Sequence, residues 1–442
     1  MLCIFALISS QSLYSNAKDP EFGLVAQPSV FSGLSDLLPL LLQKVTAEHP
    51  QVQSQIQNLQ AAGMAWQVSQ QAYWPTPSIS MERVQTPSAD LGYKDSPQVL
   101  SFRLQQPLWT GGRLTAQSNK ALATQAIEHA RLIEIQQALA LKTLQAWTEV
   151  VLAHRQQQVF EKSETVQLQL LQKITRRAEQ GLSPQNEVNY ANLRLAQVRQ
   201  DRFNASHQEN LAWIRLSQWV PEAKHLGHAL IHPDGHLMSL EGLALKQALP
   251  HWETISLENS PLILRLEGLV QLQKAELAEK RASFQPEVYL RAEHQRGGLT
   301  FPNSSSTQRV FVGFSASTGA GLGLSYQLAA LQNKHDSALQ EIAVARRGVL
   351  EAIQTDFLNA LARQSKAEML RRHLESSQEI QAAWERQFIN GKKTWIDVMN
   401  AARDTSQAEL AVIDNEMAGL QSLVRLHIQA HRSSSWPVVP VP

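Results

Sequence analysis

Cysteine is almost absent from this 442-residue chain, in which Cys3 is the only one. Because Cys3 lies in a stretch predicted to be an export signal, the remaining chain has no cysteine left for a disulfide. The 40 basic and 39 acidic residues balance, so overall charge gives no reason to expect nucleic acid as a partner. No apolar run approaches the ~20 residues of a membrane-spanning helix, so any membrane crossing would have to use strands.

Glycine and proline are also absent from one long stretch, residues 113–180, which is rich in Ala, Gln, Leu and Glu. Residues 324–390 have a similar composition, with Gly348 as the only interruption. A helix of this length extends ~100 Å, because each residue rises ~1.5 Å. That length exceeds any globular core, so we expect these helices to pack side by side in a coiled-coil-like assembly.

The chain ends carry their own signals. Residues 1–17 are predicted to be a signal peptide, with a short apolar core followed by small residues. No basic residue precedes Lys18, although such signals normally start with one, and the alternative interpretation is a buried N-terminal segment. Residues 18–35 are then expected to form an N-terminal periplasmic segment, and residues 432–442 a disordered tail.

The two halves of the chain share landmarks at an almost constant offset. Pairs displaced by 210 or 211 positions include Pro50 and Pro261, Pro75 and Pro286, and Gly181 and Gly391. Landmarks that recur in the same order predict an internal duplication. The repeats span residues 36–217 and 257–431, and residues 218–256 are predicted to form a connector between them.

Each repeat is expected to contain a helix, two strands, a long helix, a turn and a final helix. The predicted strands are 77–86, 98–108, 287–296 and 308–317. The predicted helices are 36–73, 113–180 and 184–217 in the first repeat, and 257–284, 324–390 and 394–431 in the second.

Polar and apolar residues alternate along three of the predicted strands. In one of them Leu100, Phe102 and Leu104 alternate with polar neighbours, and each strand is about ten residues long, which suits a tilted membrane strand. A soluble sheet would show the same alternation, but the long helices run away from the apolar face and leave it uncovered. Four strands cannot close a barrel, so we expect several copies of the chain to share one.

Aromatic residues mark the predicted junctions between helices and strands. Tyr73, Trp74 and Trp109 lie there, as an aromatic girdle at a membrane interface requires. The predicted fold class is therefore a membrane β-barrel continued by a long α-helical coiled-coil barrel, internally duplicated, with four strands per chain.

Several segments together resemble the TolC-type family of outer-membrane channels. The matching segments are 73–75 (YWP), 104–113 (LQQPLWTGGR), 180–183 (QGLS) and 391–400 (GKKTWIDVMN). The resemblance covers nearly all of residues 36–431. It implies a homotrimer with a twelve-stranded barrel, embedded in outer-membrane lipid and engaged by a periplasmic adaptor and an inner-membrane transporter.

The resemblance also assigns roles to the turns between the long and final helices. Adaptor contacts are expected at Gly181, Leu182, Ser183, Gly391 and Lys392. The aperture or gate is expected at Asp397, Asn400 and Glu187. The second family carboxylate is Asn400 here, which puts a second acidic ring in doubt. The alternative interpretation is that Asp397 and Glu187 only stabilise the starts of their helices.

The predicted function is passive conduction of cargo, with no enzymatic activity, no cofactor and no resident metal. The segments 286–290 and 393–400 look most like the branch that serves ABC transporters in type I secretion of proteins such as large adhesins. Small-molecule or metal efflux is the alternative, and a soluble coiled-coil scaffold is an alternative of another class. Histidines of the connector, such as His225 and His251, are interpreted as surface or interface residues, with a metal site as the alternative.

Overall fold

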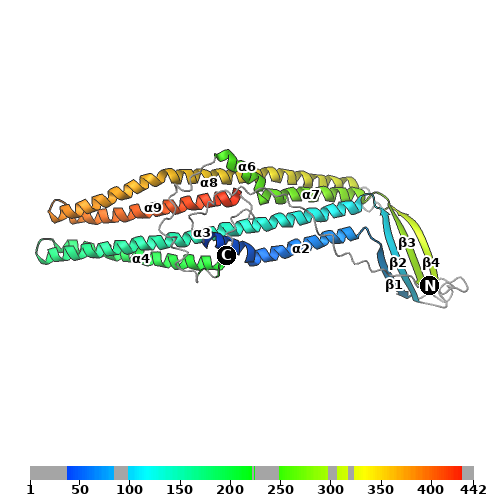
Figure 1. Cartoon of the computed structure of the whole chain (residues 1–442), viewed down its shortest axis with the longest axis horizontal. Helices are drawn as coiled ribbons and strands as arrows, with labels where there is room; N and C mark the ends of the chain where they lie inside the picture. The colour runs from blue at the N-terminus through cyan, green and yellow to red at the C-terminus, as the bar shows by residue number, and fades with distance from the viewer. Residues whose placement is uncertain are drawn as a thin grey trace, which may run out of the picture.

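The computed structural model describes residues 37–83, 98–221, 223, 248–296, 306–316 and 323–430. The molecule is elongated, with a sheet at one end and helices that run away from it to two turns at the other end (Figure 1). The elements are α1 (Leu37–Glu48), α2 (Pro50–Gln71), β1 (Thr76–Arg83), β2 (Gln98–Trp109), α3 (Arg113–Glu179), α4 (Gln185–Trp219), α6 (Leu249–Asn259), α7 (Pro261–Ala282), β3 (Glu287–Arg296), β4 (Ser306–Ser315), α8 (Leu324–Ile389) and α9 (Trp395–Ala430). Both halves therefore have the same order from α2 and α7 onward.

The four strands form one antiparallel sheet in the order β1-β2-β3-β4. The central pair, β2 and β3, comes from different repeats, with Phe102 opposite His294 and Leu104 opposite Ala292. This pairing joins the repeats into one sheet, whose outer strands β1 and β4 each have a single partner within the chain.

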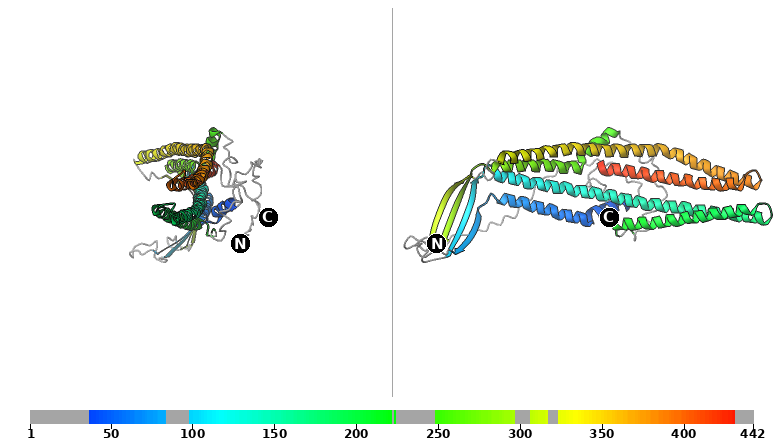
Figure 2. Two further views of the ribbon diagram at one scale, coloured as in Figure 1. Left: turned by 90° about the vertical axis from the view of Figure 1, so that its left-hand side faces the viewer. Right: turned by 180° about the vertical axis from the view of Figure 1, so that it is seen from behind.

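The two long helices, α3 and α8, each carry shorter helices along their length (Figure 2). Helix α3 contacts α4 toward the turns and α2 toward the sheet, while α7 contacts both α3 and α8. Ion pairs such as Arg265 with Glu134, at 2.8 Å, connect α7 to α3. The repeats therefore pack against each other through helices as well as strands.

The main hydrophobic core lies midway along the helices, where α1, α3, α4, α8 and α9 meet. Its fully buried members include Leu38, Trp147, Leu216 and Val424. A second cluster joins α3, α4, α8 and α9 near the turns. Elsewhere α3 and α8 have long exposed faces, as coiled-coil partners do before assembly.

Two predicted helices differ from the structure at their boundaries. The segment 36–73 is divided into α1 and α2 at His49, because Pro50 lacks an N–H and cannot continue the preceding helix. Pro261 likewise begins α7 and separates it from α6, which lies partly within the predicted connector 218–256. The predicted segments 1–17, 18–35 and 432–442, with most of the connector, lie outside the described residues.

Within the described part of the chain, no helix is both long enough and apolar enough to cross a membrane.

Candidate functional site

The sheet has one apolar face and one polar face. Strand register places the apolar residues that alternate along β2, β3 and β4 on the same face, so that Leu104, Ala292 and Val310 form one cross-strand row. Strand β1 adds Ile79 and Met81 to this face, which the sequence pattern had not singled out. These side chains are exposed in the single chain, with Val312 75% accessible.

The opposite face carries a network of charged and polar groups. Arg103 on β2 forms an ion pair with Glu293 on β3 at 3.6 Å. Arg291 donates from Nε to Gln105 Oε1 at 3.2 Å, and its guanidinium lies 4.7 Å from the centre of the Tyr289 ring. One face therefore suits lipid and the other suits water.

Aromatic residues lie at the junction between the sheet and the helices. Tyr73 and Trp74 lie between α2 and β1, Trp109 ends β2, and Trp74 is 71% exposed. Tyr73 Oη lies 3.1 Å from Thr115 Oγ1 at the start of α3. Such a position agrees with the predicted interfacial role of these three residues, which stays a prediction.

Glycine shapes the bend from β2 into α3. Gly111 and Gly112 have φ values of 58° and 88°, a left-handed conformation that glycine adopts at little cost. A Cβ on Gly111 would overlap the side chain of Gln285, which lies at the junction of α7 and β3 in the second repeat. Arg113 then forms an ion pair with Glu287 at the start of β3. These contacts join the bend between β2 and α3 to the junction between α7 and β3.

The two turns at the far end of the helices have the same backbone. Gly181 and Gly391 have φ values of 72° and 70°. In the first turn the Leu182 N–H donates to the carbonyl of Arg177, and in the second the Lys392 N–H donates to that of Gln387. The N–H groups of Gly181 and Gly391 donate to the next carbonyls along, those of Ala178 and Phe388. Both turns therefore have the hydrogen bonds of a Schellman motif at the end of a helix.

A capping box starts α9 after the second turn. The Asp397 carboxylate accepts from Thr394 Oγ1 at 2.9 Å and from the Thr394 N–H at 3.1 Å, and the Asp397 N–H donates back to Thr394 Oγ1 at 3.3 Å. These hydrogen bonds with Thr394 hold the pKa of Asp397 below its ordinary value. Asp397 is therefore a structural cap of its helix as well as a carboxylate that stays ionised.

The first turn has no such box. Pro184 occupies the position equivalent to Thr394 and makes no side-chain cap. Glu187, equivalent to Asp397, has an Oε2 atom that is buried without a hydrogen-bond partner among the described residues. The duplicated acids therefore lie in different surroundings.

The predicted adaptor-contacting residues lie at the surface of the turns. Gly181, Leu182, Gly391 and Lys392 are exposed and Ser183 is half-buried, as is the predicted gate residue Asn400. Leu182 is 62% accessible. Two exposed apolar residues beside the second turn, Ile389 and Ile396, were not predicted.

An aromatic cluster supports the second turn and contacts the first helix hairpin, which consists of α3 and α4. Trp395 is 1% exposed, and its ring centre lies 5.0 Å from that of Phe388. The guanidinium of Arg177, on α3, lies 4.9 Å from the Phe388 ring. Lys173 of α3 also forms an ion pair with Glu385 of α8. These contacts, which the sequence pattern did not reveal, tie the two hairpins together.

Most of the connector histidines, including His225, lie outside the described residues. His251 lies on α6, where its ring packs edge-on against Trp252. Within the described ranges, no group of three or more His, Cys, Asp or Glu side chains has the arrangement of a metal site.

Comparison with protein families identifies one match, to the family described as "Outer membrane efflux protein". It covers residues 41–220 and 254–428, one segment in each repeat. No curated protein is matched by the sequence at a significant level.

Solved structures share this fold at low sequence identity. A membrane protein from Pseudomonas aeruginosa has a TM-score of 0.78 and 16% identity over 91% of this chain and 94% of its own. CusC has a TM-score of 0.78 and 14% identity over 93% and 96% of the two chains. The outer membrane protein VceC from Vibrio cholerae has a TM-score of 0.74 and 14% identity over 90% and 96%.

These likenesses confirm the predicted fold of strands continued by very long helices, and the family match confirms the resemblance on which the prediction drew. The family also places the protein in the outer membrane. Because the match covers most of both repeats, the chain belongs to the outer membrane efflux protein family.

Proposed function

We propose that three copies of this chain form a passive export duct across the outer membrane and periplasm. The observation that carries the proposal is the amphipathic sheet, whose outer strands β1 and β4 each have an edge that no other described strand pairs with. Backbone groups in lipid need partners, and four strands are too few to close a barrel. Three copies, joined β4 to β1, would give a closed twelve-stranded barrel with the apolar face outward.

Exposed apolar side chains on the helices support the same assembly. Tyr326, Val344 and Met369 on α8 and Phe203 on α4 are each more than half exposed in the single chain. Their positions along the whole length of the helices suit burial against neighbouring copies. The helices would then enclose a periplasmic tunnel continuous with the barrel.

The test of the duct is the size and shape of the protein purified in detergent. We expect particle images of a trimer, about as long as the helices predict, with a barrel at one end. Recovery of the chain entirely from the soluble fraction without detergent would instead support a coiled-coil scaffold and contradict the duct.

The turns are the proposed contacts with a periplasmic adaptor, itself coupled to an inner-membrane transporter. The surface around Leu182 and Lys392, extended by the exposed Ile389 and Ile396, supports this role. We expect cysteine-directed crosslinking from Leu182 and Lys392 to capture the adaptor. A matched cysteine at Val68, which is exposed far from the turns, should capture none.

The gate is proposed to include three residues: Asp397, Asn400 one turn further along α9, and Glu187, which occupies the position equivalent to Asp397 in the first repeat. The hydrogen bonds that lower the pKa of Asp397 keep its carboxylate charged, and three such charges around one axis would favour cations. Planar-bilayer recordings of Asp397→Asn should show reduced cation preference, with Asp414→Asn, an exposed acid on another face of the same helix, as the matched control. An unchanged ion preference would remove Asp397 from the gate.

The proposed cargo is protein, such as a large adhesin, delivered by an ABC-type transporter in type I secretion. The resemblance of segments 286–290 and 393–400 to that branch supports it. The family description favours the second candidate, efflux of small molecules or metal ions. Deletion of the gene should abolish surface display of a secreted protein without increasing sensitivity to toxic compounds; the reverse outcome would support efflux.

A further inference from the structure

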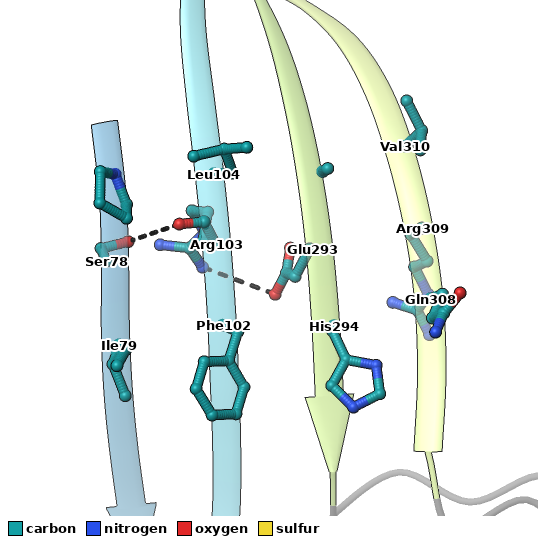
Figure 3. Close-up of a pocket in the computed structure, with 12 residues that line it drawn as sticks. Ser78, Ile79, Phe102, Arg103, Leu104, Glu293, His294, Gln308, Arg309 and Val310 are labelled. Carbon is teal, nitrogen blue, oxygen red and sulfur yellow. Dashed lines mark hydrogen bonds and ion pairs between the residues drawn. The ribbon is translucent and has the colours of Figure 1, made fainter. Parts of the chain in front are cut away.

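The apolar face of the sheet is hollowed near the middle of its strands (Figure 3). The hollow measures about 640 Å³ and is lined by residues of all four strands. Ala292 lies in its lining between Leu104 on β2 and Val310 on β4. Because Ala292 has a smaller side chain than either neighbour, the row leaves a gap there that a hydrocarbon chain could fill.

A polar pair interrupts the next row of the hollow. His294 lies beside Phe102, with ring centres 6.3 Å apart, and opposite Gln308 on β4 (Figure 3). The Nδ1 atom of His294 is buried and has no hydrogen-bond partner among the described residues. A buried polar atom without a partner is costly, so this position points to a ligand with a polar group.

Two arginines follow on the same face. Arg296 is opposite Leu100 and Arg83 is opposite Gln98, so strand alternation places both side chains on the apolar side of the sheet. Both are exposed, and the described part of the chain gives neither an acidic partner. The nearest strand carboxylates, Glu82 and Glu293, alternate onto the opposite face. This end of the apolar face is therefore positively charged.

The orientation of the molecule decides what this surface meets. The helices extend into the periplasm, so the end of the sheet that carries Arg83 and Arg296 lies at the outer leaflet. The aromatic residues Trp74 and Trp109 mark the opposite, periplasmic boundary. Basic side chains at the border of an apolar surface are suited to anionic lipid headgroups, and arginine pairs well with phosphate.

We propose that this surface binds a phosphorylated, multiply acylated lipid of the outer leaflet. One acyl chain would occupy the hollow at Ala292, a phosphate would lie at Arg83 and Arg296, and a polar headgroup atom would pair with His294. The inference rests on the proposed lipid-facing role of the apolar face. The hollow supplies apolar contact and the arginines supply charge, a combination that free phosphate cannot use.

The test is binding of purified lipid A with two phosphates to the full chain in detergent, measured by native mass spectrometry. We expect Arg83→Gln/Arg296→Gln to weaken binding at least about tenfold, the loss of roughly one charge-assisted contact. Ala292→Leu, which fills the hollow without changing charge, should weaken it several-fold. Lys334→Gln removes an exposed positive charge from α8, outside the sheet, and should leave binding unchanged.

Three outcomes would overturn the proposal. These are equal binding by the double variant and the wild type, equal binding of dephosphorylated lipid A, or displacement of the lipid by inorganic phosphate alone. Oligomeric mass and channel conductance are measured on the same preparations. A monomer that does not conduct contradicts the export duct, whereas loss of lipid binding in a conducting trimer contradicts only the lipid site.

Discussion

The two helix hairpins end in turns with the same backbone and different side-chain surroundings. Both turns use a left-handed glycine and the same pair of helix-ending hydrogen bonds. The second turn adds a capping box at Thr394 and Asp397 and a buried tryptophan, Trp395. The first turn has Pro184 and the exposed Gln185 in the equivalent positions.

This difference teaches that duplication preserved the turn itself while the packing around it diverged. A Schellman ending depends on backbone conformation alone, so both copies retain it. The aromatic cluster of Trp395 and Phe388 exists only beside the second turn, where Arg177 of the first hairpin reaches it. We infer that the second turn is the better-anchored of the two.

The largest expected effect comes from the buried tryptophan. Trp395→Ala should cost about 3–5 kcal/mol of local stability, because it leaves a cavity against Phe388. The matched change, Gln185→Ala in the first hairpin, should stay within about 0.5 kcal/mol. Hydrogen exchange of amides beside each turn measures both. An equal loss of amide protection in the two variants would contradict the proposed difference in anchoring.

The glycines should behave alike. Gly181→Ala and Gly391→Ala each force a left-handed alanine, at about 1–2 kcal/mol, although a Cβ would meet no atom at either site. Thermal unfolding of the two single variants is the measurement. Similar shifts in the unfolding temperature would support the inference that the two turns have the same backbone conformation, and clearly unequal shifts would refute it.

The cap should matter in the second turn alone. Thr394→Ala removes the hydroxyl that bonds Asp397 and should cost about 1 kcal/mol. Ser183 precedes α4 but makes no side-chain hydrogen bond among the described residues, so Ser183→Ala should have a negligible effect. Amide exchange over the first turn of α9 and of α4 compares them, and a larger loss in α4 would contradict the assignment.

The smallest expected effect is a dependence on pH. The pKa of Asp397 in the folded protein lies below its ordinary value of 3.8. The ionised carboxylate therefore stabilises the folded state fully at pH values above 3.8. This stabilisation is lost as the pH falls through the lowered pKa. The protection factors of amides beside the second turn, which correct for the intrinsic exchange rate at each pH, should therefore fall in acid. Asp397→Asn should abolish this acid response, and its persistence in that variant would assign it to another group.

Much of the helical architecture could be read from local sequence. The long helices, predicted at 113–180 and 324–390, begin and end within one residue of α3 and α8. Such agreement is expected where glycine and proline are absent inside a segment and glycine follows it. Short helices were harder, because Pro50 and Pro261 divide segments whose composition is otherwise continuous.

The candidate sites were only partly visible in the sequence. The Thr394-to-Asp397 spacing is a recognisable capping signal, but only the structure shows the reciprocal hydrogen bonds. The contact of Arg177 with Phe388 could not be anticipated, because the two residues belong to different repeats and meet only through packing. The sequence predicts the strand at 77–86 but does not make its apolar alternation evident, because one of its apolar positions is Pro77, a residue depleted in strands.

The sequence by itself determined the periodic features of this protein: the lengths of the helices, the glycine turns, the alternation along the strands and the duplication. These depend on neighbours along the chain. Tertiary structure alone decided that β2 of one repeat pairs with β3 of the other. It also brought Ala292, His294 and Arg296 of β3 beside residues of the first repeat on one apolar face. Such contacts join residues far apart in sequence, so no local pattern encodes them.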